Sequence, residues 1–346
     1  MKLLLHIGAA KAGSTTIQDS LFLNRAALAQ QGIAYWQPSD ATVPPPRVLS
    51  NLFEPGRKPL LPKERLHFAT REESRAFSRR EWDRMAAEIG AQGPALTILS
   101  SESLYYLRPG PILDELRRTF SEIVVLMYVR DPVPLYRSAL DQLIRDGARL
   151  ADLPLPAQVR LGAADTLRRY RQQLGAENVI LRRFDRACLA GGDLLVDLYQ
   201  QIGLIHGQPV APLHPVHSTN ESFSAAATLW ILGLNEGFER LGSGGDAAQI
   251  QRRQVLLERL RRAPGLTGLP KLTDPPAAIQ DWIRRANRDD IAFLNQHAFD
   301  RTLPLEGPDS DAPLPPEAEQ RQAVRDWLLG QVRPEDLARV LVAALP

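Results

Sequence analysis

The chain has 346 residues, 44% of them hydrophobic, and its 42 basic residues nearly balance its 40 acidic ones, for a formal net charge of +2. This length and apolar content predict one large globular domain, or a domain with an appended lobe. The balanced charge, without a basic stripe, argues against a nucleic-acid partner. The single cysteine, Cys188, excludes an intrachain disulfide framework and fits a reducing compartment, so we expect a cytoplasmic protein.

The beginning of the chain predicts a βαβ unit. Residues Lys2 to Gly8 form an apolar run that His6 interrupts before it could serve as a secretory signal, and we interpret it as a buried first strand. A helix is expected from Gly13 to Gly32 and a short strand from Ile33 to Trp36. No run reaches the roughly 18 apolar residues of a spanning helix, so we expect no integral membrane segment.

Strands and helices are predicted to alternate through the next part of the chain. Residues 37–64 are dense in proline and are expected to form a long loop without regular structure, of the kind that covers active sites. The further strands are predicted at 95–100, 123–129 and 179–183, and the further helices at 71–92, 132–146, 158–174 and 193–202. The continuous hydrophobicity of the strands at 95–100 and 123–129 indicates a mostly parallel central sheet, and the alternation of strands with helices is typical of an α/β fold with helices flanking the sheet.

The C-terminal part is predicted to be helical. After residue 218 the apolar pattern indicates helices at 224–240, 247–262 and 277–298, a helical cap spanning 218–300. A linker at 307–316 precedes two short helices around Trp327 and Leu337. We therefore divide the chain into a domain of residues 1–306 and a C-terminal segment of residues 307–346.

A loop rich in small residues follows the first predicted strand. It reads Gly8-Ala-Ala-Lys11-Ala12-Gly13-Ser14-Thr15-Thr16 and opens a helix, where backbone N–H groups and the helix dipole favour an anion. In nucleotide triphosphatases the lysine follows the last glycine, whereas here Lys11 precedes Gly13. A tightly packed turn without a ligand would use the same small residues, so the loop alone leaves both interpretations open.

A second phosphate-binding pattern follows the strand at 123–129. Arg130 ends this strand, Asp131-Pro132 provides the N-cap and first position of the next helix, and Ser138 lies two turns into that helix. Guanidinium offers a planar fork of donors and the hydroxyl one more, a set suited to a phosphate. The alternative is a capped helix in which Arg130 pairs with Asp131.

Together these segments resemble the two nucleotide motifs of the sulfotransferases that use 3′-phosphoadenosine 5′-phosphosulfate (PAPS), in the family's order. The resemblance covers residues 2 to about 300 and is nearest to bacterial carbohydrate-modifying members. It implies an α/β fold of the P-loop nucleotide-binding type. It implies that PAPS donates a sulfuryl group to a hydroxylated acceptor, a carbohydrate or other small alcohol, and that 3′-phosphoadenosine 5′-phosphate (PAP) is released. The implied 5′-phosphosulfate ligands are Lys11, Ala12, Gly13, Ser14 and Thr15, and the implied 3′-phosphate ligands are Arg130 and Ser138.

The sequence departs from the family pattern at two positions of the loop. Ala10 replaces the usual proline, and Ala12 replaces the usual hydroxyl residue beside Lys11. These changes leave open a homologue that binds PAP or a glycan without turnover. A P-loop kinase-like nucleotide enzyme is a further alternative, although the order of Lys11 and Gly13 argues against it.

Sulfuryl transfer needs positive charge at the leaving phosphate and a base at the acceptor hydroxyl. Lys11 and the helix N-terminus would supply the charge. Glu102 directly follows the strand at 95–100 and is our candidate base, because it should project from the same sheet edge as the loop. His6 is the main competitor, and three loop histidines stay open as well: His67, His214 and His217.

Metals, the acceptor and the oligomeric state are the remaining questions that the sequence addresses. No His, Cys, Asp and Glu residues show zinc-ligand spacing, and sulfuryl transfer does not demand a magnesium clamp, so no metal is expected. The sequence leaves the acceptor's identity open. Trp327 and the apolar segment from Val340 to Leu345 would be compatible with a homo-oligomer.

Overall fold

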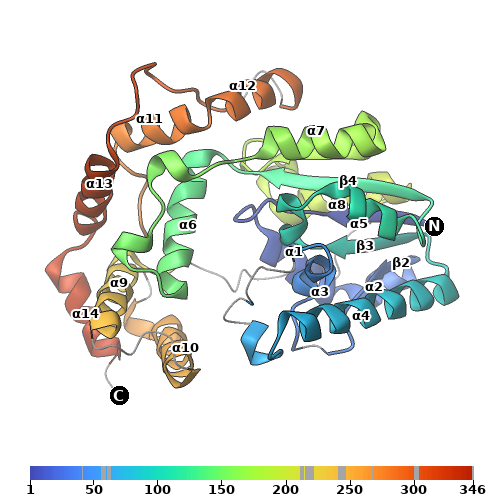
Figure 1. The fold of residues 1–346 in the computed structure, drawn as a ribbon, viewed down its shortest axis with the longest axis horizontal. Coiled ribbons are helices and arrows are strands. Elements are labelled where there is room, and N and C mark those ends of the chain that lie inside the picture. The colour runs from blue at the N-terminus through green and yellow to red at the C-terminus, as the bar shows by residue number, and fades with distance from the viewer. Residues whose placement is uncertain are drawn as a thin grey trace. The chain divides into compact units, whose positions relative to one another are not determined.

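The computed structural model describes residues 1–40, 42–55, 60, 64–210, 214, 222–240, 247–266, 268–299 and 304–344. It contains a five-stranded sheet in the order β2-β3-β1-β4-β5, in which all neighbouring strands run parallel (Figure 1). The strands are β1 Lys2–His6, β2 Ile33–Tyr35, β3 Leu96–Ser100, β4 Glu122–Val129 and β5 Val179–Arg183. The predicted α/β class with a parallel central sheet is confirmed.

Helices make up most of the remaining structure. They are α1 Ser14–Leu23, α2 Arg25–Gln30, α3 Pro45–Asn51, α4 Arg71–Gln92, α5 Pro109–Leu116, α6 Pro132–Asp146, α7 Ala163–Leu174, α8 Leu194–His206, α9 Ala225–Arg240, α10 Ala247–Arg262, α11 Ala277–Ala286, α12 Arg288–His297, α13 Glu317–Leu329 and α14 Pro334–Ala344. Within the described ranges, none of these helices combines the length and apolar character that crossing a bilayer would require.

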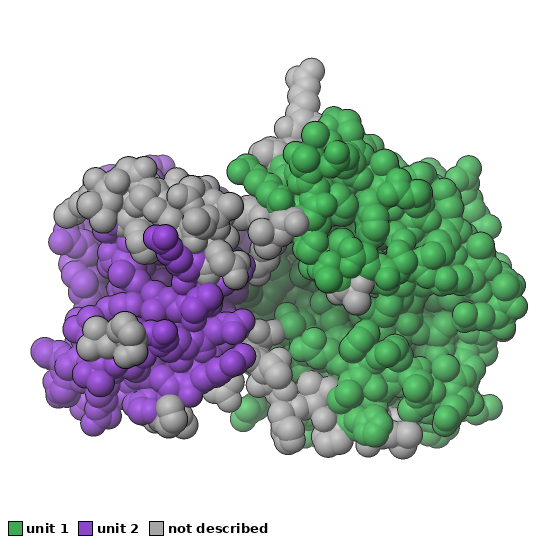
Figure 2. Space-filling model, turned by 90° about the horizontal axis from the view of Figure 1, so that it is seen from below, with its two compact units in different colours: residues 1–130, 162–220, 293–304 green, residues 131–161, 221–292, 305–346 purple. Residues whose placement is uncertain are grey.

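The chain forms two compact units (Figure 2). Unit 1 comprises residues 1–130, 162–220 and 293–304 and holds the sheet. Unit 2 comprises residues 131–161, 221–292 and 305–346 and is built from α6, α9, α10, α11, α13 and α14. The domain division at residue 306 stays a prediction.

The core of unit 1 forms on the sheet, because the three central strands β3, β1 and β4 are buried on both faces. Leu4 of β1 and Leu126 of β4 are fully buried and pack against apolar side chains of α1, α2 and α8. Successive strand residues point to opposite faces, so Leu3 and Leu5, also buried, face the other side. Helix α7 contacts β4 and β5, and α5 packs on α7.

The core of unit 2 joins α6 to the C-terminal helices. Helix α6 packs on α9 and α11, and α13 and α14 both contact α9. Tyr136 of α6 stacks on Trp327 of α13 with ring centroids 6.4 Å apart, and both rings are buried. The helices predicted around Trp327 and Leu337 are therefore part of the core of unit 2.

Two helices predicted as continuous are each broken at a buried asparagine. Asn24 separates α1 from α2, and Asn287 separates α11 from α12, which corrects the predicted spans 13–32 and 277–298. Each side-chain amide donates to the carbonyl four residues earlier, to Ser20 at 3.0 Å and to Ile283 at 2.8 Å. Each carboxamide oxygen also accepts a backbone N–H from a distant segment, His214 or Leu161. Side-chain bonding to the backbone competes with helix continuation.

Two further predictions of secondary structure were wrong, and one helix was not predicted. The proline-rich segment 37–64 contains helix α3, whose N-cap and first two residues are Pro44, Pro45 and Pro46, positions where proline needs no N–H partner. Helix α5 was not predicted because its start, Pro109-Gly-Pro, is typical of a turn. Helix α7 begins at Ala163 rather than at residue 158, after Gly162 in the left-handed conformation.

Candidate active site

Three neighbouring strands bring the candidate segments to one edge of the sheet. Strand β1 lies between β3 and β4, with His6 in register with Ser100 and Leu126. Since all three strands are parallel, the loop after β1, Glu102 after β3 and Arg130 after β4 follow carboxyl ends at the same edge. The chain also passes here from one side of β1 to the other, and such switch points are where open α/β sheets bind ligands.

The loop after β1 is pinned to β4 by its backbone. Ala9 N–H donates to the Tyr128 carbonyl and Tyr128 N–H donates to the Gly8 carbonyl, both at 2.7 Å. Lys11 has a φ of 62°, an uncommon value for a residue with a side chain. The loop therefore turns sharply into α1 with Lys11 at the bend.

Helix α1 presents its N-terminus at this turn. Its first backbone hydrogen bond runs from Ile17 N–H to the Gly13 carbonyl at 3.0 Å, so the N–H groups of residues 14–16 have no acceptor within the helix. Thr15 is exposed and Thr16 half-buried, while the buried Ser14 hydroxyl donates to the Ala9 carbonyl at 3.2 Å. The Ser14 hydroxyl is thus used inside the loop, and its N–H remains at the helix end.

Glycine at position 13 is favoured both by the backbone conformation there and by close neighbours within the protein. A Cβ at this position would lie 2.2 Å from Leu194 Cδ2 and 3.1 Å from Phe184 Cε2, and the φ of Gly13 is 84°. At Gly13 the close neighbours are side chains of this chain, from the segment after β5 and the start of α8.

Arg130, the first residue of the second predicted phosphate-binding segment, contacts the first segment within unit 1. Its Nη1 donates to the Lys11 carbonyl at 3.3 Å, and its guanidinium carbon lies 5.5 Å from the centroid of the Phe184 ring. The cation is therefore held at the loop by a hydrogen bond and a cation–π contact. Sequence reasoning missed this role of Phe184, because no local pattern links residue 184 to residue 130.

Ser138 lies in unit 2, on α6. The predicted start of this helix is confirmed, with Asp131 as N-cap accepting the Val133 N–H at 2.9 Å and Pro132 in the first turn. Ser138 is half-buried on the second turn. Its role as a phosphate ligand stays a prediction.

Glu102 lies against the beginning of the loop. It opens the 3₁₀ turn η2, Glu102–Tyr106, and a Cβ at Gly8 would come within 3.0 Å of its Cβ. Gln18 of α1 donates from Nε2 to Glu102 Oε2 at 2.9 Å. Only glycine, with its φ of 103°, allows β1 and the Glu102 turn to approach this closely. Sequence reasoning missed Gln18, although its position one turn into α1 was a usable signal.

The phenol of Tyr35, in β2, is kept protonated by its surroundings. Burial raises the pKa of Tyr35, and the negative charges of Asp19 and Glu102 raise it further, while a hydrogen bond with Gln37 acts in the opposite direction. Tyr35 therefore adds no negative charge near Glu102.

His6 is enclosed rather than available to a substrate. Its side chain is 1% exposed, its Nδ1 lies 2.8 Å from Ser100 Oγ, and burial lowers its pKa to about 4. His6 is thus neutral near pH 7 and has no surface that could meet an acceptor. Of the other histidines, His67 is exposed, with its Nδ1 3.5 Å from the Thr42 hydroxyl, and the His214 backbone bonds to Asn24. His217 lies outside the described residues.

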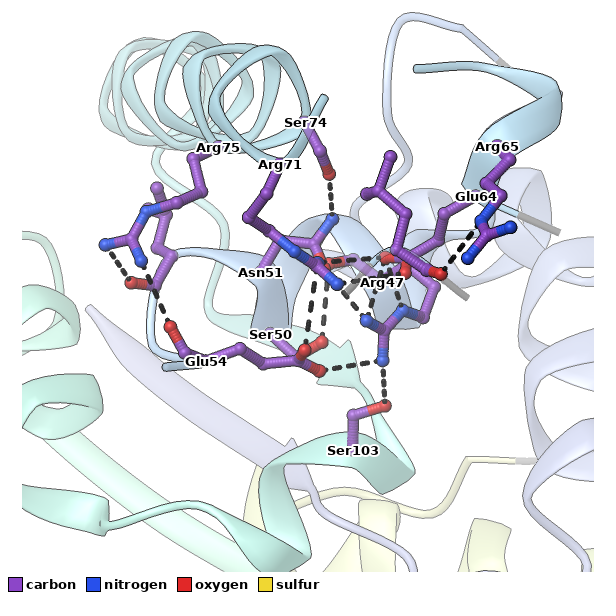
Figure 3. Close-up of polar contacts among 12 residues, drawn as sticks. Arg47, Ser50, Asn51, Glu54, Glu64, Arg65, Arg71, Ser74, Arg75 and Ser103 are labelled. Atoms are coloured by element: carbon purple, nitrogen blue, oxygen red, sulfur yellow. Dashed lines mark hydrogen bonds and ion pairs between the residues drawn. The ribbon is translucent and has the colours of Figure 1, made fainter. Parts of the chain in front are cut away.

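A buried charge cluster supports the turn that carries Glu102 (Figure 3). It consists of Arg47, Glu54, Glu64 and Arg71. Arg47 bonds Glu54 at 2.9 Å and Glu64 at 2.8 Å, and its Nη1 reaches Ser103 Oγ at 3.3 Å. The Ser101 hydroxyl also donates to the Pro46 carbonyl at 2.7 Å, so α3 holds the turn on both sides of Glu102.

Sequence reasoning missed this cluster. Its residues lie in and beside the proline-rich segment, where charged side chains usually face water. The described residues contain no group of three or more His, Cys, Asp or Glu side chains arranged to hold a metal ion.

Two solved structures share similarity of fold with this chain. One is a sulfotransferase from Alicyclobacillus acidocaldarius, which is 17% identical over 71% of this chain and 97% of its own, with a TM-score of 0.38. The other is the sulfotransferase domain from the curacin biosynthetic pathway, which is 16% identical over 64% of this chain and 80% of its own, with a TM-score of 0.34. No protein-family model and no curated protein matches the sequence. The function proposed below rests on the residues of the site.

Proposed function

We propose that this protein is a sulfotransferase that uses PAPS as donor and transfers the sulfuryl group to a hydroxyl, of a carbohydrate or another small alcohol. The observation that carries this proposal is the hydrogen bond from Arg130 to the Lys11 carbonyl. It joins the two segments that resemble the 5′-phosphosulfate and 3′-phosphate motifs, at one edge of a parallel sheet.

The donors at this edge suit an anionic nucleotide. The N–H groups of residues 14–16, the Lys11 ammonium and the Arg130 guanidinium are cationic or partly positive, and none of them requires a metal. When bound, PAPS would supply an activated sulfuryl group. Lys11 and the N-terminus of α1 would stabilise the charge that develops on its 5′-phosphate, and Arg130 would hold its 3′-phosphate.

Glu102 is the proposed base. It would take the proton of the acceptor hydroxyl while the acceptor oxygen forms a bond to sulfur and the bond from sulfur to the 5′-phosphate oxygen breaks. The products are a sulfate ester, PAP and a proton held first by Glu102. Gln18 bonds Oε2 of Glu102, and none of the described residues bonds its Oε1. One carboxylate oxygen is therefore available for that proton.

Calorimetric titration with PAP, beside ATP with magnesium, tests the donor. We expect PAP to bind in the micromolar range and ATP with magnesium to give no response. The opposite result would overturn the proposal in favour of a kinase-like enzyme. PAP binding without any turnover of PAPS, with water or a panel of sugars and small alcohols as acceptors, would instead indicate a non-catalytic homologue.

Three variants separate the roles of the site residues. Arg130→Ala should weaken PAP binding by about 10- to 100-fold, the loss expected for hydrogen bonds to a charged group. Lys11→Ala should mainly slow transfer, and Glu102→Gln should slow it by roughly 100-fold or more while sparing PAP binding. Arg118→Ala is the control, because this side chain is 71% exposed and precedes β4 at the opposite edge of the sheet.

A further inference from the structure

A chain of four polar side chains leads from the candidate base into the core of unit 1. Gln18 Nε2 lies 2.9 Å from Glu102 Oε2 and 3.2 Å from Ser100 Oγ. Ser100 Oγ in turn lies 2.8 Å from His6 Nδ1. The four residues come from α1, the start of η2, the last position of β3 and the last position of β1.

We propose that Gln18 is a positioning residue that holds the carboxylate of Glu102, with Ser100 and His6 as its support. The catalytic meaning of this role rests on the proposed function, because it requires that Glu102 act as the base. The contact itself is a property of the fold, and it can be tested without turnover.

The hydrogen-bonding capacity of the Gln18 amide makes it suited to this role. An amide nitrogen carries two protons, and Gln18 directs them to two oxygens, one on Glu102 and one on Ser100. The contact with Glu102 identifies this atom as the nitrogen, because an ionised carboxylate cannot donate to an amide oxygen. Both protons of the Gln18 amide nitrogen are therefore used in hydrogen bonds, and only one oxygen of Glu102 receives one of them.

Ser100 and His6, the two residues of this hydrogen-bonded series that lie farthest from Glu102, are buried. Ser100 is 2% exposed and His6 is 1% exposed, and both lie on strands that are neighbours in the sheet. A buried neutral imidazole beside Ser100 Oγ restricts the rotation of the hydroxyl, which in turn fixes where the Gln18 amide can bind. Buried polar networks whose members bond one another hold a single geometry in this way.

The buried charge cluster and Gln18 act on different parts of the turn that carries Glu102: its backbone and the carboxylate. Arg47 and the Pro46 carbonyl fix the backbone turn through Ser103 and Ser101, whereas Gln18 alone contacts the carboxylate among these groups. Loss of Gln18 should therefore release the carboxylate and leave the turn in place.

A double-mutant cycle tests the contact independently of catalysis. Urea midpoints would be measured for Gln18→Ala, for Glu102→Ala and for the double variant. If Gln18 holds Glu102, the double variant should shift the midpoint by clearly less than the sum of the two single shifts. Additive shifts would overturn the proposal, whether or not the protein binds PAP.

Turnover of PAPS with water as acceptor tests the catalytic consequence. In that reaction water attacks sulfur, PAP and inorganic sulfate are released, and the base takes a proton from water. Gln18→Ala should lower kcat by at least 10-fold, with an unchanged dissociation constant for PAP. Gln30→Ala, at an exposed position of α2, is the matched control and should behave as wild type.

The isosteric variant Gln18→Glu separates positioning from space filling. It keeps the shape of the side chain but replaces the donor with a second carboxylate, so it should be at least as slow as Gln18→Ala. Wild-type kcat in either variant would overturn the positioning role. Failure of the wild-type protein to bind PAP would instead reject the proposed function, and the double-mutant cycle would still report on the contact.

Discussion

Replacing Glu64 by glutamine tests whether the buried charge cluster stabilises unit 1. Glu64 is 4% exposed and accepts hydrogen bonds from both arginines of the cluster, at 2.8 Å from Arg47 Nη2 and 3.3 Å from Arg71 Nη2. Glutamine has nearly the same shape, but it removes one of two negative charges that face two positive ones. Its amide protons would also point at guanidinium donors.

The expected cost follows from this imbalance. Removing one partner of a buried ion pair leaves an uncompensated charge and costs roughly 3–5 kcal/mol. The Arg47 side chain is 16% exposed, so water can solvate part of the excess charge. We therefore expect the lower end of this range, a decrease of about 3 kcal/mol in the free energy of unfolding.

Native-state hydrogen exchange of the β1 and β3 amides is the suitable assay, because it reports the opening of unit 1 separately from unit 2. Asp165→Asn is the control, since it makes the same chemical change in unit 1 at a carboxylate that is 67% exposed and lies 3.0 Å from Arg169. It should cost no more than about 0.5 kcal/mol. If the two variants lose the same unfolding free energy to within about 1 kcal/mol, the charge cluster does not stabilise unit 1.

Further expectations concern the loop glycine, the buried histidine and the C-terminal helices. Gly13→Ala should destabilise unit 1 by about 2 kcal/mol or more, because alanine is strained at a φ of 84° and its Cβ would also displace Leu194. Gly90→Ala, on an exposed face of α4 with no neighbour within 4 Å, should instead stabilise unit 1 by about 0.5–1 kcal/mol. Equal effects of the two substitutions in urea unfolding would contradict this requirement for glycine at position 13. Burial lowers the pKa of His6 to about 4 from 6.5, so the unfolded chain binds the proton first and stability present above pH 6.5 is lost as the pH falls toward 4. Between about pH 7.5 and pH 5 this loss should be about 2 kcal/mol, and it should be missing in His6→Asn. Trp327→Ala should lower the unfolding free energy of unit 2 by about 3 kcal/mol, and an unaffected unit 2 in hydrogen exchange would contradict a core role for α13.

Elements whose cause is local were predictable from the sequence. Strands β1, β3 and β4 are short, mostly apolar runs that are buried on both faces, and the observed β4 and β5 agree with the predicted strands to within a residue. The N-cap of α6 was equally predictable, because Asp131 bonds an N–H only two residues away. Lys11, Glu102 and Arg130 could be chosen as candidates for a similar reason, since each directly follows or lies close to the end of a predicted strand.

The two helix breaks and helix α3 depend instead on contacts between distant residues. Nothing near Asn24 or Asn287 in the sequence marks a helix break, and their distant partners at His214 and Leu161 complete the bonding that interrupts each helix. Helix α3 lies in a segment rich in proline, a residue that local rules assign to loops. In the fold this helix is held by charged partners, Glu64 and Arg71, that follow it by many residues.

The sequence by itself determined the α/β alternation, the order of the two phosphate-binding patterns and the residue types of the candidate site, because strand burial, helix capping and loop chemistry act over a few residues. Only the tertiary structure decided which groups meet. Three contacts at the site join residues far apart in the chain: Arg130 bonds the Lys11 carbonyl 119 positions away, Gln18 bonds Glu102 84 positions away, and Arg47 of the charge cluster bonds Ser103 56 positions away. Such contacts depend on the order of strands in the sheet, which places β3, β1 and β4 side by side.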